Sequence, residues 1–197
     1  MIRLRLPRQG RHRPPTGFTL IELMVTVAVI GILSGITISQ SLATWRDAQV
    51  SDLTLQLAGW LEQISRAPEA SRAPDGNAAS CRVVFTTGTV PNGAVIATVT
   101  SIPAGASPPC APEASFTVPT RFGNQQISVG ASTASVVFTP RQSITSTSDI
   151  QIRLALLGQA PVRCVRLSAV LGLIRIGRND GSSATGTDCP AASFDTI

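Results

Sequence analysis

The stretch Gly17-Phe18-Thr19-Leu20-Ile21-Glu22-Leu23-Met24-Val25 begins an apolar segment that continues to about Ile38. As a helix, residues 18–40 would span roughly 34 Å, which is enough to cross the hydrocarbon core of a bilayer. Glu22 is the one charged residue in this range, and it falls in the first helical turn. The stretch therefore predicts a membrane-spanning helix that carries a single carboxylate near its start.

The residues before this helix form a basic leader. Residues 1–17 hold five arginines and no acidic residue, whereas the rest of the chain holds eleven arginines and eleven acids, so the formal charge of +5 belongs to the leader. No Ala-x-Ala-like cleavage site follows the apolar block, and the small residue Gly17 precedes it instead. Arginines on this side favour a cytoplasmic leader and an exported C-terminal part. Once the leader is removed, the balance of charge excludes a globally cationic nucleic-acid binder.

The basic leader, the sequence Gly-Phe-Thr-Leu-Ile-Glu and the apolar run resemble the class III signal of type IV pilins and type II secretion pseudopilins, over about residues 13–40. The resemblance implies that a prepilin peptidase cuts between Gly17 and Phe18 and methylates the new N-terminus at Phe18. It also implies that Glu22 is the assembly residue, neutralised by the Phe18 ammonium of a neighbouring subunit. The alternative is that Glu22 is a charge tolerated at the membrane interface of a single-pass anchor.

The helical pattern continues beyond the apolar segment. Side chains that would share one helix face recur at steps of three and four residues: Leu42, Trp45, Gln49, Leu53, Leu57, Trp60, Leu61 and Ile64. We expect one helix from about Thr19 to Arg66 that ends before Pro68, with residues 18–40 as its transmembrane and assembly half and residues 41–66 as its amphipathic half. Both tryptophans are predicted to be core residues. Residues 67–80, rich in Ala, Pro, Ser and Gly, indicate a linker.

From Cys81 onward the pattern changes to short runs rich in β-branched residues. They cover residues 82–87, 94–100, 115–118, 126–129, 135–139, 150–157, 162–168 and 173–176. The predicted fold class is therefore α+β and pilin-like, with one long N-terminal helix packed on a β-rich periplasmic head of residues 81–197. The head most resembles the GspH/FimT group of minor pseudopilins, in its length and in its arginine-containing C-terminal hairpin. Residues 143–149 and 181–187 are polar loops of low complexity with no identifiable task.

The composition leaves little room for catalysis. The only histidine, His12, lies in the leader, and the chain has neither lysine nor tyrosine, so no Ser/His/Asp, Cys/His or His-containing metal site can be assembled. We expect no enzyme activity, no cofactor and no metal. The four cysteines lack CxxC spacing, and their even number in an exported head predicts disulfides. Three pairings are possible; the sequence-local set, Cys81–Cys110 with Cys164–Cys189, is favoured, and free buried thiols are the alternative.

The favoured function is structural, that of a minor pilin or pseudopilin in a type IV pilus or a type II secretion pseudopilus. Its expected partners are other such subunits, the prepilin peptidase and the inner (cytoplasmic) membrane, which it crosses once with its head in the periplasm or on an extracellular filament. The alternative is a DNA-binding minor pilin that acts in DNA uptake (natural transformation). The candidate phosphate contacts lie within sixteen residues that contain no acid: Arg163, Arg166, Arg175 and Arg178. Solvated hairpin charges, or a membrane-anchored domain without a filament, are the remaining interpretations.

Overall fold

The computed structural model describes residues 17–123, 125–169 and 171–194, without the side chains of residues 36–43. Its long helix, α1, spans Leu20–Ala70. The chain forms two compact units, Met1–Leu42 and Ala43–Ile197, so that α1 contributes residues to both. The basic leader, apart from Gly17, lies outside the described residues, and so do the side chains of residues 36–40 within the predicted span.

In the first unit, α1 presents apolar side chains in every direction. Residues 17–35 are all exposed, and the large apolar ones among them are Phe18, Leu20, Ile21, Leu23, Met24, Val25, Val27, Val29, Ile30, Ile32 and Leu33. A helix that is apolar all round is normally covered by lipid or by other protein chains. Across the described residues, no helix is long and apolar enough to cross a membrane.

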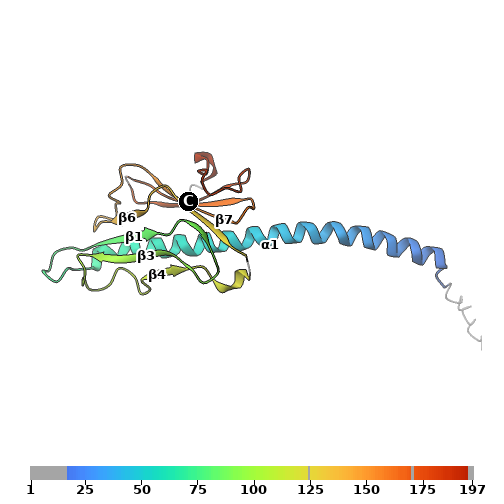
Figure 1. Ribbon diagram of the computed structural model, residues 1–197, viewed down its shortest axis with the longest axis horizontal. Coiled ribbons are helices and arrows are strands. Elements are labelled where there is room, and N and C mark those ends of the chain that lie inside the picture. The colour runs from blue at the N-terminus through green and yellow to red at the C-terminus, as the bar shows by residue number, and fades with distance from the viewer. Residues whose placement is uncertain (1–16, 124, 170, 195–197) are drawn as a thin grey trace, which may run out of the picture. The chain divides into compact units, whose positions relative to one another are not determined.

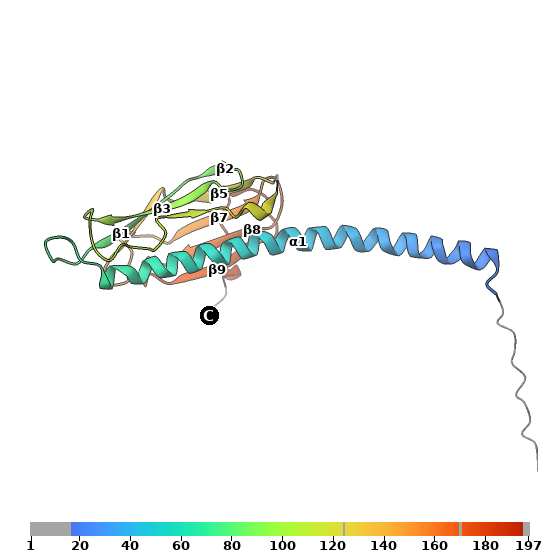
Figure 2. The ribbon, with the colours of Figure 1, turned by 90° about the horizontal axis from the view of Figure 1, so that it is seen from below.

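The second unit contains two antiparallel sheets and the C-terminal part of α1, which runs along the strands in both views (Figures 1 and 2). The first sheet has the order β4-β3-β1-β6 and the second has the order β2-β5-β7-β8-β9. The strands of the first sheet are β1 Ser80–Phe85, β3 Val95–Ile102, β4 Ser115–Thr117 and β6 Ser135–Phe138. Those of the second are β2 Gly88–Val90, β5 Ile127–Ala131, β7 Ile150–Leu156, β8 Val162–Leu167 and β9 Ile174–Asn179. Two short 3-10 helices, η1 Thr120–Phe122 and η2 Ala191–Ser193, complete the elements.

One hydrophobic core joins α1 to both sheets. Its fully buried members include Leu53 and Leu61 of α1, Val83 of β1, and Ile152 of β7. The strands alternate because successive side chains point to opposite faces, so Val165 and Leu167 of β8 enter this core while their neighbours do not. The chain is therefore an α+β protein with an N-terminal helix packed on a β-rich head, as the sequence predicts.

Two details of the helix correct the sequence-based prediction. The helix does not end before Pro68: it includes this residue and ends at Ala70, and the backbone N–H of Ser71 still donates to the carbonyl of Ala67 at 3.1 Å. Proline lacks the N–H that would donate to the carbonyl of Ile64, so including Pro68 costs the helix one hydrogen bond close to its end. The first four residues of the predicted linker, 67–70, therefore belong to the helix.

The second correction concerns the tryptophans. Trp60 is buried, donates its Nε1–H to the Glu113 carbonyl and packs against Phe116 with ring centroids 5.7 Å apart. Trp45, in contrast, is 57% exposed and is not a core residue. The buried core begins on α1 only at Val50, more than one helical turn beyond Trp45. Leu42 was also predicted to lie on the apolar face of the helix, but its side chain is not among those that the structure describes.

Candidate functional site

The start of α1 is closed by a reciprocal hydrogen-bonded cap. Thr19 donates both its backbone N–H and its hydroxyl to Glu22 Oε2, each at 2.9 Å, and the Glu22 N–H donates to Thr19 Oγ1 at 3.3 Å. This is the capping box that a threonine and a glutamate three residues apart form at a helix N-terminus. The cap uses one carboxylate oxygen, and among the described residues Oε1 receives no hydrogen bond. Glu22 can therefore cap its own helix and still accept a hydrogen bond from a cation outside.

The four arginines of the C-terminal hairpin form two cross-strand pairs on opposite faces of the sheet. In the register of β8 and β9, Arg163 lies opposite Arg178, and Arg166 lies opposite Arg175. Residues directly opposite each other in an antiparallel pair share a face, and like charges in such positions repel. The hairpin therefore needs negative charge on each face, and the structure supplies it from three segments.

On the core-facing side the negative charge comes from Asp47 of α1 and from Asp180, which directly follows β9. Arg163 donates from Nε and Nη2 to Asp47, in three contacts of 3.1, 2.6 and 2.8 Å. The Arg163 side chain is only 14% exposed, so this bidentate pair is largely shielded from water. Arg178 on the same face pairs with Asp180, which raises its pKa, with Asp47 adding to the effect from further away.

On the opposite face the negative charge comes from Asp149, which immediately precedes β7. Its carboxylate receives the backbone N–H of Ala169 at 2.9 Å and the Nε of Arg166 at 2.8 Å. These two donors, helped by the charge of nearby Arg175, hold the Asp149 pKa below its usual value. Arg166 also lies over the Phe194 ring, with its Cζ 5.4 Å from the centroid.

The structure thus brings the four arginines together but neutralises most of them. Arg163, Arg166 and Arg178 each make an ion pair, and Arg175 makes none within the described part of the chain. The hairpin itself contains no acidic residue. The carboxylates that pair with its arginines are those of Asp47, Asp149 and Asp180, which all lie outside it. Asp149 lies in one of the two loops to which the sequence assigned no task.

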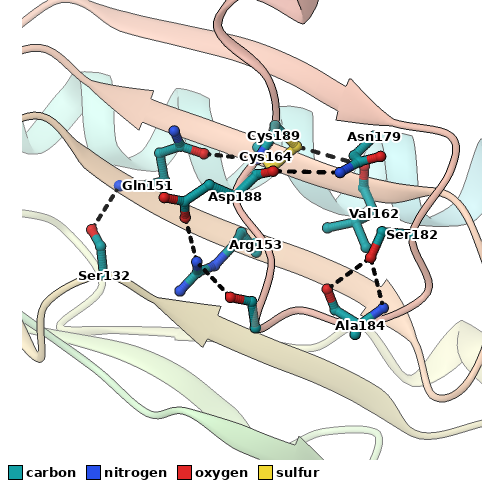
Figure 3. A network of polar contacts seen from close by, with 11 residues as sticks. Ser132, Gln151, Arg153, Val162, Cys164, Asn179, Ser182, Ala184, Asp188 and Cys189 are labelled. Carbon is teal, nitrogen blue, oxygen red and sulfur yellow. Dashed lines mark hydrogen bonds and ion pairs between the residues drawn. A yellow bond between two sulfur atoms is a disulfide. The ribbon is translucent and has the colours of Figure 1, made fainter.

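The other of these loops belongs to a C-terminal strap, residues 181–194, that crosses the face of the second sheet opposite the core (Figure 3). The strap is fixed by the Cys164–Cys189 disulfide, by an ion pair from buried Arg153 to Asp188, and by a 3.0 Å hydrogen bond from the Cys189 N–H to Gln151. It also approaches the sheet closely, because a Cβ built on Gly177 would lie 2.7 Å from the Phe194 ring. Arg153 was not among the residues that the sequence analysis singled out, because it lies inside an ordinary β-strand pattern, residues 150–157, that gives no sign of a partner.

The second disulfide, Cys81–Cys110, ties the start of β1 to the loop after β3. The structure therefore has the sequence-local pairing, and none of the four cysteines, all within the described residues, is free. Across the part of the chain that is described, no cluster of His, Cys, Asp and Glu has the composition to hold a metal ion. The polar groups of the head are thus arranged for ion pairs and crosslinks.

Comparison with known families identifies the N-terminal segment. The model of the prokaryotic N-terminal methylation motif matches residues 14–38, which include the Thr19–Glu22 cap. The chain therefore carries a type IV pilin-like prepilin signal, and the motif implies the prepilin peptidase and other pilin subunits as partners. The motif family is structural and not enzymatic. No curated protein matches the chain. No solved structure matches it either.

Proposed function

We propose that the chain is a minor pilin or pseudopilin, a structural subunit of a type IV pilus or a type II secretion pseudopilus, in the GspH/FimT group. The prepilin peptidase cuts between Gly17 and Phe18 and methylates Phe18. Residues 18–40 then anchor the subunit once in the inner membrane and pack against other subunits in the filament. Residues 41–66 carry the head of residues 81–197, which lies in the periplasm or on an extracellular filament.

The observation that carries this proposal is the exposed apolar surface of α1 next to a capped carboxylate. Eleven large apolar side chains between Phe18 and Leu33 are 49–83% exposed, and their further burial against lipid and neighbouring helices would be strongly favourable. Cleavage after Gly17 leaves Phe18 as a new cationic N-terminus one residue before the cap. The free Oε1 of Glu22 is then available for the Phe18 ammonium of an adjacent subunit, and this contact sets the register between helices.

Phosphate binding by the hairpin is not part of the proposal. Uptake of DNA needs cations that face solvent together, whereas three of the four hairpin arginines already have carboxylate partners. Arg166 and Arg175 also face away from Arg163 and Arg178. No observation on the described residues favours DNA as a second function.

The test separates the charge of Glu22 from its role as a cap. Glu22→Gln keeps an oxygen that can accept from Thr19 but removes the charge, and Thr19→Val removes the hydroxyl of the cap but keeps the charge. Incorporation into sheared filaments, in competition with the wild type, is expected to fall about tenfold or more for Glu22→Gln, since a charge-assisted hydrogen bond contributes about 1.5–3 kcal/mol. Thr19→Val should incorporate nearly as well as the wild type.

Processing is the control in the same experiment. The intact mass of each membrane-extracted variant should show the loss of residues 1–17 and the gain of one methyl group. Wild-type incorporation of correctly processed Glu22→Gln would contradict the assembly role. A full-length mass in cells with active prepilin peptidase would contradict the proposed cleavage site and, with it, the proposed function.

A further inference from the structure

A groove with both polar and apolar walls lies in the head between α1 and the hairpin of β8 and β9. It encloses about 580 Å³, which is within the range of pockets that hold ligands. Leu55 of α1 and Leu171 and Leu173 of the hairpin line it and are exposed, and its other side chains include two arginines and a glutamate. The groove therefore offers apolar contact and charge in the same place.

The α1 wall of the groove has open space but no net charge. Gly59 lies on this wall, and a Cβ atom built on it would meet nothing within 4 Å apart from the adjacent helix backbone. Glu62 and Arg66 on the same wall form an ion pair with each other, so their charges cancel. What the α1 wall contributes to a ligand is space beside Leu55.

The hairpin wall contributes the charge of Arg175. This arginine is the one of the four in the hairpin that makes no ion pair within the described part of the chain. Asp149 lines a smaller hollow next to the groove together with Arg175, but its carboxylate already accepts from Arg166 and from the Ala169 N–H. Among the described residues, the positive charge of Arg175 is thus left for an anionic group of a ligand.

One end of the groove is held by a strained turn. Gln142 lines this end and has a φ of 57°, in the left-handed region, and its side-chain amide donates to Glu69 of α1 at 2.6 Å. The hairpin turn packs directly against it, since a Cβ atom built on Gly172 would overlap the Gln142 carbonyl oxygen. Backbone strain that surrounding contacts enforce is concentrated at ligand clamps and other functional sites. This end of the groove is therefore preformed.

The groove also borders the edge of a sheet. The strand β9 is the last one of its sheet, and in the described chain its outer edge pairs only at Gly177, with Phe194. Ile174, Arg175 and Ile176 of β9 line the groove. The two isoleucines pack against the core, so Arg175 between them lies on the other face of the strand. An extended segment added to this edge would alternate between the same two faces.

We propose that the groove binds an extended segment of a partner protein, which adds to the edge of β9 and carries a carboxylate between two apolar side chains. Residues opposite each other on neighbouring strands share a face, so the carboxylate meets Arg175 while the apolar side chains meet Ile174 and Ile176 beside α1. Three extended residues reach about 10 Å, the length of this part of β9. The pattern apolar, acidic, apolar is thus what the groove selects.

A second copy of the head fits this edge less well than such a segment. Two β9 strands that pair symmetrically about Arg175 would place the two arginines directly opposite each other, and like charges in these positions repel. A charged side chain on an edge strand is a common protection against edge-to-edge association. Arg175 therefore both disfavours self-pairing and selects a partner of opposite charge. The inference does not depend on Glu22 or on assembly into filaments.

Binding of a synthetic peptide to the full chain, in detergent and without reducing agent, tests the proposal. The probe is a fluorescent peptide with blocked ends and the sequence Thr-Val-Asp-Val-Thr, and the matched probe has lysine in place of aspartate. Fluorescence anisotropy should show saturable binding of the aspartate probe and much weaker binding of the lysine probe. Equal affinity for the two probes, or no saturable binding of the aspartate probe, would overturn the proposal.

One variant tests the charge of the groove. Arg175→Gln should weaken binding of the aspartate probe about tenfold or more, which is the effect of losing one charge-assisted hydrogen bond. This variant is expected to fold, because it also removes the repulsion between Arg175 and Arg166. Arg82→Gln is the matched control, since Arg82 is an exposed arginine on a strand of the other sheet, and it should bind as the wild type does.

A second variant tests the space in the groove without changing any charge. Gly59→Leu fills the open part of the α1 wall, and leucine is a better helix former than glycine, so the thermal unfolding temperature should not fall. Binding should weaken at least tenfold, whereas Gly59→Ala should stay close to the wild type. Wild-type affinity in Gly59→Leu or in Arg175→Gln would overturn the proposal. A dimer in sedimentation that Gly59→Leu disperses would assign the groove to a second copy and overturn it as well.

Discussion

Removing Asp47 should destabilise the head through the arginine it leaves behind. Asp47→Ala deletes three hydrogen bonds to Arg163, whose side chain is 14% exposed and cannot move freely into water. The carboxylate itself is 33% exposed, so the pair is neither fully buried nor a surface pair. Breaking a buried pair costs about 3–5 kcal/mol and breaking an exposed one about 0–1, which places this change at about 2 kcal/mol.

The repulsion between Arg163 and Arg178 adds to this loss, because Asp47 is the acid that faces both. For a chain of this size, about 2 kcal/mol corresponds to a fall in Tm of about 4–8 °C. Asp47→Asn keeps an acceptor and should lose about half as much. The measurement is thermal unfolding of the detergent-solubilised, non-reduced chain, followed by circular dichroism.

The matched control is Asp52→Ala, one helical turn further along α1. Asp52 pairs with Arg121, but both side chains are about half exposed, so the loss should stay below about 1 kcal/mol. In the double variant Asp47→Ala with Arg163→Met, part of the stability should return because no unpaired charge remains shielded. Equal unfolding temperatures for Asp47→Ala and Asp52→Ala would refute this reasoning.

Two further predictions concern the other face of the hairpin. Because Asp149 has a lowered pKa in the folded chain, its stabilising effect is complete above the ordinary carboxyl pKa of about 3.9 and is lost as pH falls through the folded value. Asp149→Asn should therefore be less stable than the wild type at neutral pH, and unfolding curves should show this difference shrinking below about pH 4. A difference in stability that stays constant with pH would contradict the prediction. Replacing Cys164 and Cys189 together by serine opens a loop closed over 25 residues and should cost about 3 kcal/mol, with faster amide exchange across residues 181–189. Unchanged exchange there would show that the strap is held without its disulfide.

The fold was largely predictable because the local patterns and the tertiary structure agree. All eight strands expected from runs of β-branched residues are present, within a few residues at each end. The additional strand, Gly88–Val90, has three residues and begins with a glycine, so its composition carried no signal. The two errors on α1 have different reasons. The helix end was predicted from Pro68, which the last turn in fact includes. Trp45 was predicted from periodicity, which does not show that the buried core begins only at Val50.

Two parts of the candidate site could be recognised in the sequence: the N-terminal motif and the sequence-local pairing of the four cysteines. In the N-terminal motif, Gly17, Glu22 and the apolar run lie within one continuous stretch, so their order and spacing can be read directly. The cap between Thr19 and Glu22 was not predicted, although a threonine and a glutamate three residues apart are its usual signal. In the head, the partner of Arg163 lies 116 residues away on α1, and the partner of Arg166 lies in a loop without pattern. Pairings over such distances are set by the packing of α1 and the strands. The sequence could therefore show a cluster of arginines but not that it was neutralised.

The strap has a consequence for how anything else can recognise this head. Ser128 of β5, Arg153 of β7, Cys164 of β8 and Gly177 of β9 all contact it on one face of the second sheet, while the core takes up the other face. A flat β-sheet is a common platform for ligands, but this one has no open face over those four strands. Among the described residues, recognition of the head is left to strand edges, loops, the exposed side of α1 and the outer face of the first sheet, where Val84 is 41% exposed. At these places a small change in a few side chains can alter partner choice without disturbing the fold.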